Sequence, residues 1–183
     1  MWFQTTGVVL TAGVGVGSTE IVAFDAALRD AAIADFNLIR VTSIVPPNAP
    51  VYRLRRGIVP IDGNGLMLPT VYSMSTRSEP GIVSAAVGVG VPEDETRSGV
   101  IFPSEGKDID SETCVKSLKG MIEEAMQQLR RTDNFHIEHA VASGLCSDEG
   151  NWICAIGALA FVDEHLWAYF KDRVELINPR GPL

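Results

Sequence analysis

The sequence predicts a single α/β domain, a layered sandwich of mixed β-sheet and helices. Three features of the 183-residue chain favour this class. Apolar, β-branched segments of strand length recur along it, two segments have the apolar spacing of amphipathic helices, and neither a linker nor a repeat divides it. Because strands and helices do not alternate regularly, we do not expect a simple Rossmann chain.

The first expected elements are a strand over residues 7–12 and a helix over residues 21–33. Ser18 and Thr19 are typical of a helix start, since their hydroxyls cap exposed backbone N–H groups. The apolar residues of the helix would share one face. These residues are Ile21, Phe24, Leu28 and Ala32.

Further strands are expected over residues 37–45, 66–75, 82–91, 98–104, 136–142 and 152–160. The first of these runs into Pro46-Pro47, which cannot continue a sheet ladder. Residues 111–131 form the clearest helix, because their apolar side chains make one stripe. The stripe contains Cys114, Leu118, Met121, Ile122, Ala125 and Leu129. The expected order before the tail is therefore β-α-β-β-β-β-α-β-β. The tail is expected to begin with a short amphipathic helix around Leu166.

Charge and composition exclude several classes of protein. The net charge of −8 would repel phosphate backbones, so we do not expect nucleic-acid binding. No stretch reaches the roughly 18 apolar residues of a membrane helix. Cys114, Cys146 and Cys154 lack metal-ligand spacing, and we interpret them as reduced thiols in a cytoplasmic protein.

Two other patterns point to chemistry only weakly. Residues 12–19 (AGVGVGST) are similar to a phosphate-binding loop, but Gly17 stands where that loop needs a lysine, so we expect a tight strand-to-helix turn. His136 and His139 would fall on opposite faces of a strand, and a zinc site needs three or four ligands, so no metal site is expected. His165 is expected on the surface of the short helix, and no motif of a serine hydrolase is present.

Residues 37–47 (NLIRVTSIVPP) join an apolar strand to two adjacent hydroxyl residues and a Pro-Pro stop. Bonded hydroxyls at a strand end would explain them, but the stretch resembles the cleavage-site motif of the pyruvoyl-dependent arginine decarboxylases. Other segments that resemble this family are 23–28 (AFDAAL), 68–72 (LPTVY), 80–86 (PGIVSAA), 99–101 (GVI) and 105–107 (EGK). The resemblance covers about residues 7–160 in the family's order, and the tail beyond is longer than in compact members.

The resemblance implies a pyruvoyl-dependent decarboxylase fold and a proenzyme that cleaves itself between Thr42 and Ser43, into residues 1–42 and 43–183. The Ser43 hydroxyl would attack the Thr42 carbonyl, which moves the acyl group from nitrogen to oxygen. Elimination from this ester and hydrolysis would turn Ser43 into the pyruvoyl group. Thr42 stands where some members have Ser, and Asn37 is implied to assist processing through its amide.

For turnover, the resemblance implies conversion of L-arginine to agmatine and CO₂, with no diffusible cofactor and no metal. Glu105 would return a proton to the substrate Cα, and Asp25 would bind the guanidinium. The family implies a homotrimer, or a larger assembly, with active sites between protomers. Two alternatives stay open: the same chemistry on another basic amino acid, and a non-catalytic oligomeric binding protein whose chain stays intact.

Overall fold

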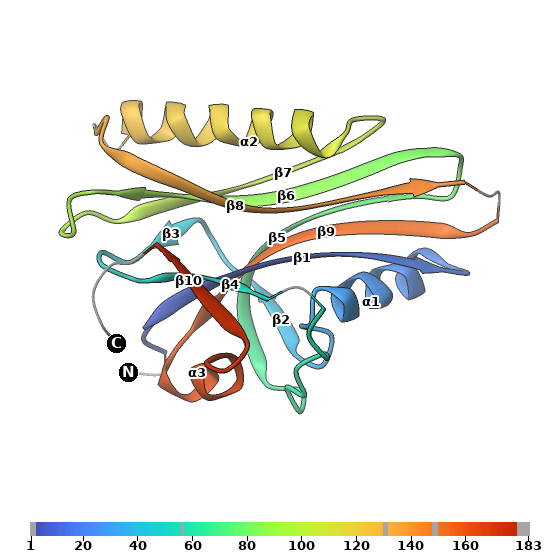
Figure 1. The fold of residues 1–183 in the computed structure, drawn as a ribbon, viewed down its shortest axis with the longest axis horizontal. Coiled ribbons are helices and arrows are strands. Elements are labelled where there is room, and N and C mark those ends of the chain that lie inside the picture. The colour runs from blue at the N-terminus through green and yellow to red at the C-terminus, as the bar shows by residue number, and fades with distance from the viewer. Residues whose placement is uncertain (1–2, 56, 130–131, 148–149, 179–183) are drawn as a thin grey trace.

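The computed structural model describes residues 3–55, 57–129, 132–147 and 150–178. Two β-sheets lie face to face, with helices on their outer sides (Figure 1). Helix α1 (Glu20–Asp30) covers one sheet and α2 (Ser111–Glu124) covers the other. The predicted layered α/β sandwich is confirmed.

The larger sheet has six strands in the order β10-β4-β1-β9-β5-β2. Its strands in chain order are β1 (Gly7–Gly17), β2 (Asn37–Arg40), β4 (Val51–Leu54), β5 (Met67–Arg77), β9 (Trp152–Val162) and β10 (Val174–Asn178). The smaller sheet has the order β3-β7-β6-β8. Its strands are β3 (Ile44–Val45), β6 (Gly81–Pro92), β7 (Gly99–Lys107) and β8 (Phe135–Cys146). The larger sheet is mixed, since β1 pairs in parallel with β4 but antiparallel with β9.

Both later helices lie where the apolar spacing predicts them. Helix α2 continues as a π-helical turn, η1 (Ala125–Leu129), and the last two residues of the predicted helix, 130–131, lie outside the described residues. The short helix is α3 (Glu164–Phe170), and it presents Leu166 to the core. The sequence does not predict β4 and β10, which are short strands of four and five residues.

Glycines of β1 bring α1 directly against the sheet. Gly13, Gly15 and Gly17 alternate with valines, so all three face the helix. A Cβ added to Gly15 would lie 2.2 Å from the Ala27 nitrogen, and one added to Gly13 would lie 2.4 Å from the Ala27 carbonyl oxygen. The glycine-rich segment therefore serves close packing within a strand, and the expected turn follows at residues 18–19.

This close packing also decides which face of α1 is buried. Thr19 caps the helix as predicted, since its Oγ1 accepts a hydrogen bond of 3.3 Å from the Val22 amide. The prediction that Ile21 faces the core is wrong, because this side chain is 75% exposed. Only small side chains fit against the glycines, so Ala23 and Ala27 face the sheet and Ile21 points away.

The single strand predicted over residues 37–45 is wrong as well. The segment forms β2, which pairs in parallel with β5, and then β3, which pairs antiparallel with β7 in the other sheet. The chain thus crosses between the sheets over residues 41–43. The apolar run could not reveal this crossing, because both halves have the composition of a strand.

The core between the two sheets holds β7, the strand with which β3 pairs after the crossing segment. Fully buried residues in this layer include Val8, Leu10, Val87, Val89, Ile101 and Leu159. Ile101 belongs to β7 and lies next to the position where β3 pairs. Burial of such side chains stabilises the fold by about 1.5–3 kcal/mol each, so β7 offers a fixed support.

Candidate active site

The Thr42–Ser43 peptide bond lies where the chain passes from one sheet to the other. On its N-terminal side, the Val41 amide donates to the Thr70 carbonyl of β5 at 3.2 Å. On its C-terminal side, the Ile101 amide of β7 donates to the Ser43 carbonyl at 2.9 Å. Thr42 is exposed and Ser43 is half-buried. The bond that the resemblance marks for cleavage is therefore held from both sheets but belongs to neither ladder.

Asn37 lies at the other end of β2 from this crossing. Its Nδ2 donates a hydrogen bond of 2.6 Å to the Gly65 carbonyl, which fixes the turn before β5. A strand rises about 3.3 Å per residue, so Arg40 already lies about 10 Å beyond Asn37. Within one chain, the amide therefore orders the start of β2 and does not face the Thr42 carbonyl.

Glu105 connects the two sheets further along β7 from the crossing segment. It lies on β7, is exposed, and accepts a hydrogen bond of 2.9 Å at Oε2 from the Met74 amide of β5. The β2 pairing ends at Thr70, so the Met74 amide would otherwise lack a strand partner on that edge. Glu105 is four residues beyond Ile101 on the same face of β7, which is about 13 Å along the strand.

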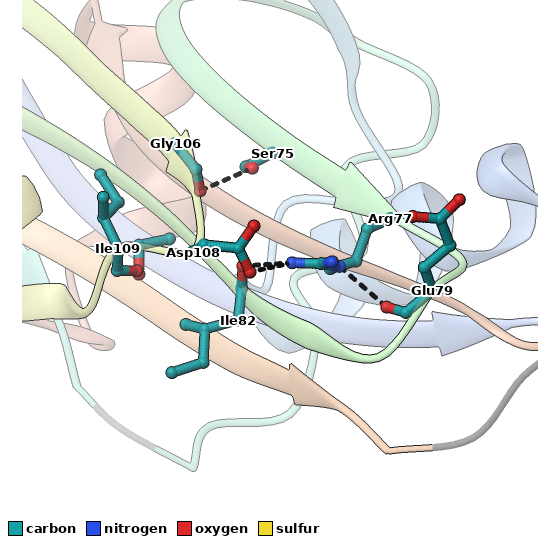
Figure 2. Close-up of polar contacts among 8 residues, drawn as sticks. Ser75, Arg77, Glu79, Ile82, Gly106, Asp108 and Ile109 are labelled. Atoms are coloured by element: carbon teal, nitrogen blue, oxygen red, sulfur yellow. Dashed lines mark hydrogen bonds and ion pairs between the residues drawn. The ribbon is translucent and has the colours of Figure 1, made fainter.

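Two further contacts between β5 and β7 follow this one in register. The Ser75 hydroxyl donates to the Gly106 carbonyl at 2.9 Å, and Arg77 Nη1 donates to Asp108 Oδ1 at 2.5 Å (Figure 2). The Arg77 side chain is only 10% exposed, and its Nε also donates to the Glu79 carbonyl at 2.8 Å. The segment that carries Glu105 is thus held at three successive points.

Sequence reasoning does not identify Arg77 or Asp108, because they are 31 residues apart in the chain. Gly81, which lies between them in the sequence, has a residue type that reflects this contact. Gly81 has φ +139°, and a Cβ there would meet the guanidinium of Arg77 at 2.2 Å. The turn into β6 must therefore be a glycine, both for its backbone and for the buried cation.

Asp25 is separated from these groups by the larger sheet. It lies on α1, on the outer face of that sheet, whereas Glu105 belongs to the smaller sheet (Figure 1). Its side chain is 63% exposed and lies 3.7 Å from Arg29. Within the single chain, Asp25 is therefore not enclosed in a pocket that could hold a guanidinium. Within the chain, Ser43 is hydrogen-bonded to β7 and Glu105 lies on β7, whereas Asp25 lies on the far side of the larger sheet.

The remaining titratable candidates do not form a second centre. Burial raises the pKa of Cys154 to about 12, with a smaller effect from Glu20, so its thiol stays protonated and unreactive. Burial, followed by Lys119 and Arg53, lowers the pKa of His139. In the described part of the chain, no three His, Cys, Asp or Glu side chains come together as a metal-ion site.

His136 and His139 of β8 are three residues apart in a strand, as expected, and so lie on opposite faces. His165 is exposed on α3, which confirms its predicted place. Within the ranges that the structure describes, none of the helices is both long and apolar enough to cross a membrane.

Comparison with known proteins identifies relatives over most of the chain. The family model described as pyruvoyl-dependent arginine decarboxylase matches residues 7–166. The pyruvoyl-dependent arginine decarboxylase of Methanocaldococcus jannaschii is 34% identical over 143 residues, which cover 75% of this chain and 83% of that protein. The enzyme of the same name from Methanopyrus kandleri is 34% identical, over 83% of this chain and 93% of that protein. Pyruvoyl-dependent arginine decarboxylase 1 of Methanosarcina acetivorans is 29% identical, over 85% and 94%.

Proposed function

Since the chain belongs to the pyruvoyl-dependent arginine decarboxylase family, we propose that it cleaves its own Thr42–Ser43 bond and then converts L-arginine to agmatine and CO₂. The observation that carries this proposal is the placement of that bond. It crosses between two sheets, with Val41 hydrogen-bonded on one side and the Ser43 carbonyl on the other. Both ends are fixed, so the Ser43 hydroxyl is confined close to the preceding carbonyl, which is the proximity that an acyl shift needs.

Cleavage uses only groups of this chain and water. The Ser43 Oγ forms a bond to the Thr42 carbonyl carbon, the C–N bond breaks, and the hydroxyl proton passes to the nitrogen. The new ester is then eliminated: Ser43 Cα loses a proton, and Thr42 leaves as a carboxylate. Hydrolysis of the dehydroalanine at position 43 releases ammonia and leaves a ketone. Residues 1–42 and 43–183 stay associated, because β1 and β2 pair with strands of the larger fragment.

The surroundings of Ser43 fit a small carbonyl group. The position is half-buried, and its backbone carbonyl is already held by the Ile101 amide at 2.9 Å. A pyruvoyl group at residue 43 supplies the electrophilic carbonyl that accepts the electron pair left by CO₂. Ile101 is fully buried, so β7 fixes the orientation of this position.

Glu105 is the proposed acid that returns a proton to the substrate Cα. Its Oε2 is oriented by the Met74 amide at 2.9 Å. In the described part of the chain, Oε1 accepts no hydrogen bond, so it is available for proton transfer. The three contacts between β5 and β7 hold its backbone, which limits the motion of the carboxyl group.

A trimer would bring Asp25 of one chain to Ser43 of the next. Apolar side chains are exposed on both sides of this proposed contact. On one side these are Ile39 and Ile44, which flank the crossing segment and are 36% and 46% exposed, and Met67 at the start of β5, which is 60% exposed. Beside Asp25, Ile21 is 75% and Val22 47% exposed. Because the two surfaces differ, their contact would be heterologous, which is the type of interface that a trimeric ring is built from.

In such a ring, Asp25 would bind the substrate guanidinium as a charge-assisted, bidentate pair. A carboxylate attracts any basic side chain, so the preference for arginine over lysine rests on the family relationship. Cys114, Cys146 and Cys154 are not joined by disulfides, which suits a reducing compartment, and we place the enzyme in the cytoplasm.

The test is the intact mass of the purified protein together with CO₂ release. We expect one fragment that ends at Thr42 and a second that resists Edman sequencing, because its N-terminus is a ketone. The preparation should release labelled CO₂ from carboxyl-labelled arginine. Ser43→Ala should fold but neither cleave nor release CO₂. A single intact chain that binds arginine would instead support a non-catalytic binding protein.

A further inference from the structure

Arg40 is held in two ways immediately before the bond that is cleaved. It is the last residue of β2, and its Nη2 donates to the Tyr72 carbonyl of β5 at 3.0 Å. Its Cζ also lies over the Tyr72 ring, 4.5 Å from the ring centroid. The Tyr72 ring in turn lies 6.4 Å from that of Phe24 on α1. An exposed arginine normally samples many rotamers, but here a stack and a hydrogen bond select one.

The hydrogen bond from Arg40 occupies a backbone carbonyl of β5 that a longer β2 would use. β2 and β5 are parallel, and the last backbone bond from the crossing segment runs from the Val41 amide to the Thr70 carbonyl. In a parallel ladder the next donor is two residues further along, so a continued β2 would place the Ser43 amide on the Tyr72 carbonyl. The Arg40 guanidinium occupies that acceptor instead.

We infer that Arg40 is a positioning residue for self-cleavage: it satisfies the Tyr72 carbonyl and so keeps the Ser43 amide out of the β5 ladder. This inference rests on the proposed function. The Ser43 nitrogen must accept a proton and leave the Thr42 carbon during the acyl shift. A nitrogen bound into a sheet would first have to lose its hydrogen bond. The same contact lets the chain turn toward β7, where Ile101 holds the Ser43 carbonyl.

Two other roles for Arg40 agree less well with its surroundings. Its positive charge would repel the amine and the guanidinium of a basic substrate and attract only the carboxylate, whereas its Nη2 and its guanidinium face are already engaged by Tyr72. As an exposed side chain, it would add little to global stability through charge alone. Because Arg40 contacts Tyr72, we expect it to act on the local course of the chain between β2 and β3.

The experiment follows the cleavage rate of freshly synthesised chains. Pulse-labelled cell-free synthesis and denaturing gels give the rate at which the intact chain becomes two fragments. Arg40→Ala should cleave about tenfold more slowly or worse, which is the effect expected from losing a charged hydrogen bond. Arg40→Lys keeps a donor but loses the planar stack, so its rate should be intermediate. Added methylguanidinium should accelerate Arg40→Ala, because it can occupy the vacated site, and should not affect Ser43→Ala.

Matched variants separate the two contacts of Arg40. Tyr72→Phe keeps the ring and should cleave normally, whereas Tyr72→Leu keeps only the backbone acceptor and should slow cleavage. Arg55 is an exposed arginine that also donates to a backbone carbonyl, that of Asp172 at 3.4 Å. Arg55→Ala should therefore cleave at the wild-type rate.

The outcomes distinguish this inference from the proposed function. A wild-type chain that never cleaves would overturn the proposed function and this inference with it. A wild-type chain that cleaves, beside a folded Arg40→Ala chain that cleaves equally fast, would overturn this inference alone. Circular dichroism reports folding, and if Arg40→Ala does not fold, unchanged cleavage in both Arg40→Lys and Tyr72→Leu overturns it.

Discussion

The Met74 amide donates a hydrogen bond of 2.9 Å to Glu105 Oε2, across the two sheets. Met74 lies on the part of β5 beyond the β2 pairing, so the carboxylate takes the place of a missing strand. The bond fixes one oxygen of Glu105 and leaves the other for chemistry. This arrangement gives the proposed proton donor a defined direction within a single chain.

Glu105→Gln should lose most of its decarboxylase activity but keep its fold and its cleavage. The amide oxygen can still accept from Met74, whereas the amide cannot protonate the substrate Cα. Loss of one acid–base group typically lowers kcat about 10²–10⁴-fold. The measurement is kcat from labelled CO₂ on fully cleaved protein, with the exposed Glu123→Gln on α2 as the control. A near-normal kcat would remove Glu105 from this role.

Arg77 should matter for stability more than its partner Asp108. Its guanidinium is 10% exposed and donates to backbone carbonyls, whereas the Asp108 side chain is 69% exposed. Arg77→Ala would remove the hydrogen bonds to the Glu79 and Ile82 carbonyls together with the packing of a largely buried side chain, at a cost of about 1–3 kcal/mol. Asp108→Asn should cost less than about 1 kcal/mol, since its charge is largely solvated.

Urea unfolding of the two single variants and the double variant measures both values and their coupling. A loss of stability of only about 1–2 kcal/mol for Arg77→Ala would still exceed the loss expected for Asp108→Asn. Equal losses for the two variants would mean that the ion pair, and not the backbone contacts, carries the stabilisation.

Gly15→Ala should destabilise the protein, because a Cβ there would meet the backbone of α1 at 2.2 Å. Neither element can move easily, so we expect a loss of about 1–3 kcal/mol or more. Gly120 of α2 is the matched control, since nothing lies within 4 Å of its added Cβ. Gly120→Ala should instead stabilise by about 0.5–1 kcal/mol. Thermal and urea unfolding of both variants decide this, and a neutral Gly15→Ala would contradict the packing described for β1 and α1.

The sequence pattern predicted the long strands well, because each is a long apolar or β-branched run, and β6 and β9 are buried on both faces. β5, β6, β7, β8 and β9 all lie within a few residues of their expected positions. It failed at residues 37–45, where two short strands in different sheets share one apolar run. It also assigned Ile21 to the core, since periodicity does not register that glycines of β1 admit only small side chains. Had the two-residue spacing of Gly13, Gly15 and Gly17 been interpreted as a packing face, it would have indicated the correct side of α1.

The residues of the candidate site could not be predicted from periodicity. Ser43, Glu105 and Asp25 came from resemblance to a family, and their roles stay predictions. Arg40, Arg77 and their partners are joined by contacts 31 or 32 residues apart, which no local pattern encodes. The Arg40 contact arises from the pairing of β2 with β5, and the Arg77 contact from the stacking of the two sheets, which are both features of the tertiary fold.

Asp25 and Ser43 provide a test of the proposed assembly through mixed trimers. Asp25→Asn should lower kcat/KM for arginine by at least tenfold in cleaved protein, because breaking a desolvated charged pair costs about 2–5 kcal/mol. Ser43→Ala should be inactive. If each site takes Ser43 from one chain and Asp25 from the next, co-expression of both variants creates some sites with both native residues. At equal expression and random mixing, about a quarter of all sites would be complete, and each ring of three that contains both variants would have one complete site.

We therefore expect the mixed protein, purified through two different affinity tags, to recover activity well above that of Asp25→Asn alone. Lysine and ornithine measured beside arginine would show whether the recovered sites also recover their preference. The control mixes Asp25→Asn with a second copy of the same variant under another tag, which should recover nothing. If the mixed protein stays at the level of Asp25→Asn, the two residues belong to one chain's site or Asp25 does not bind the substrate. Full kcat/KM in Asp25→Asn trimers would favour the second explanation, since another acid would then hold the guanidinium.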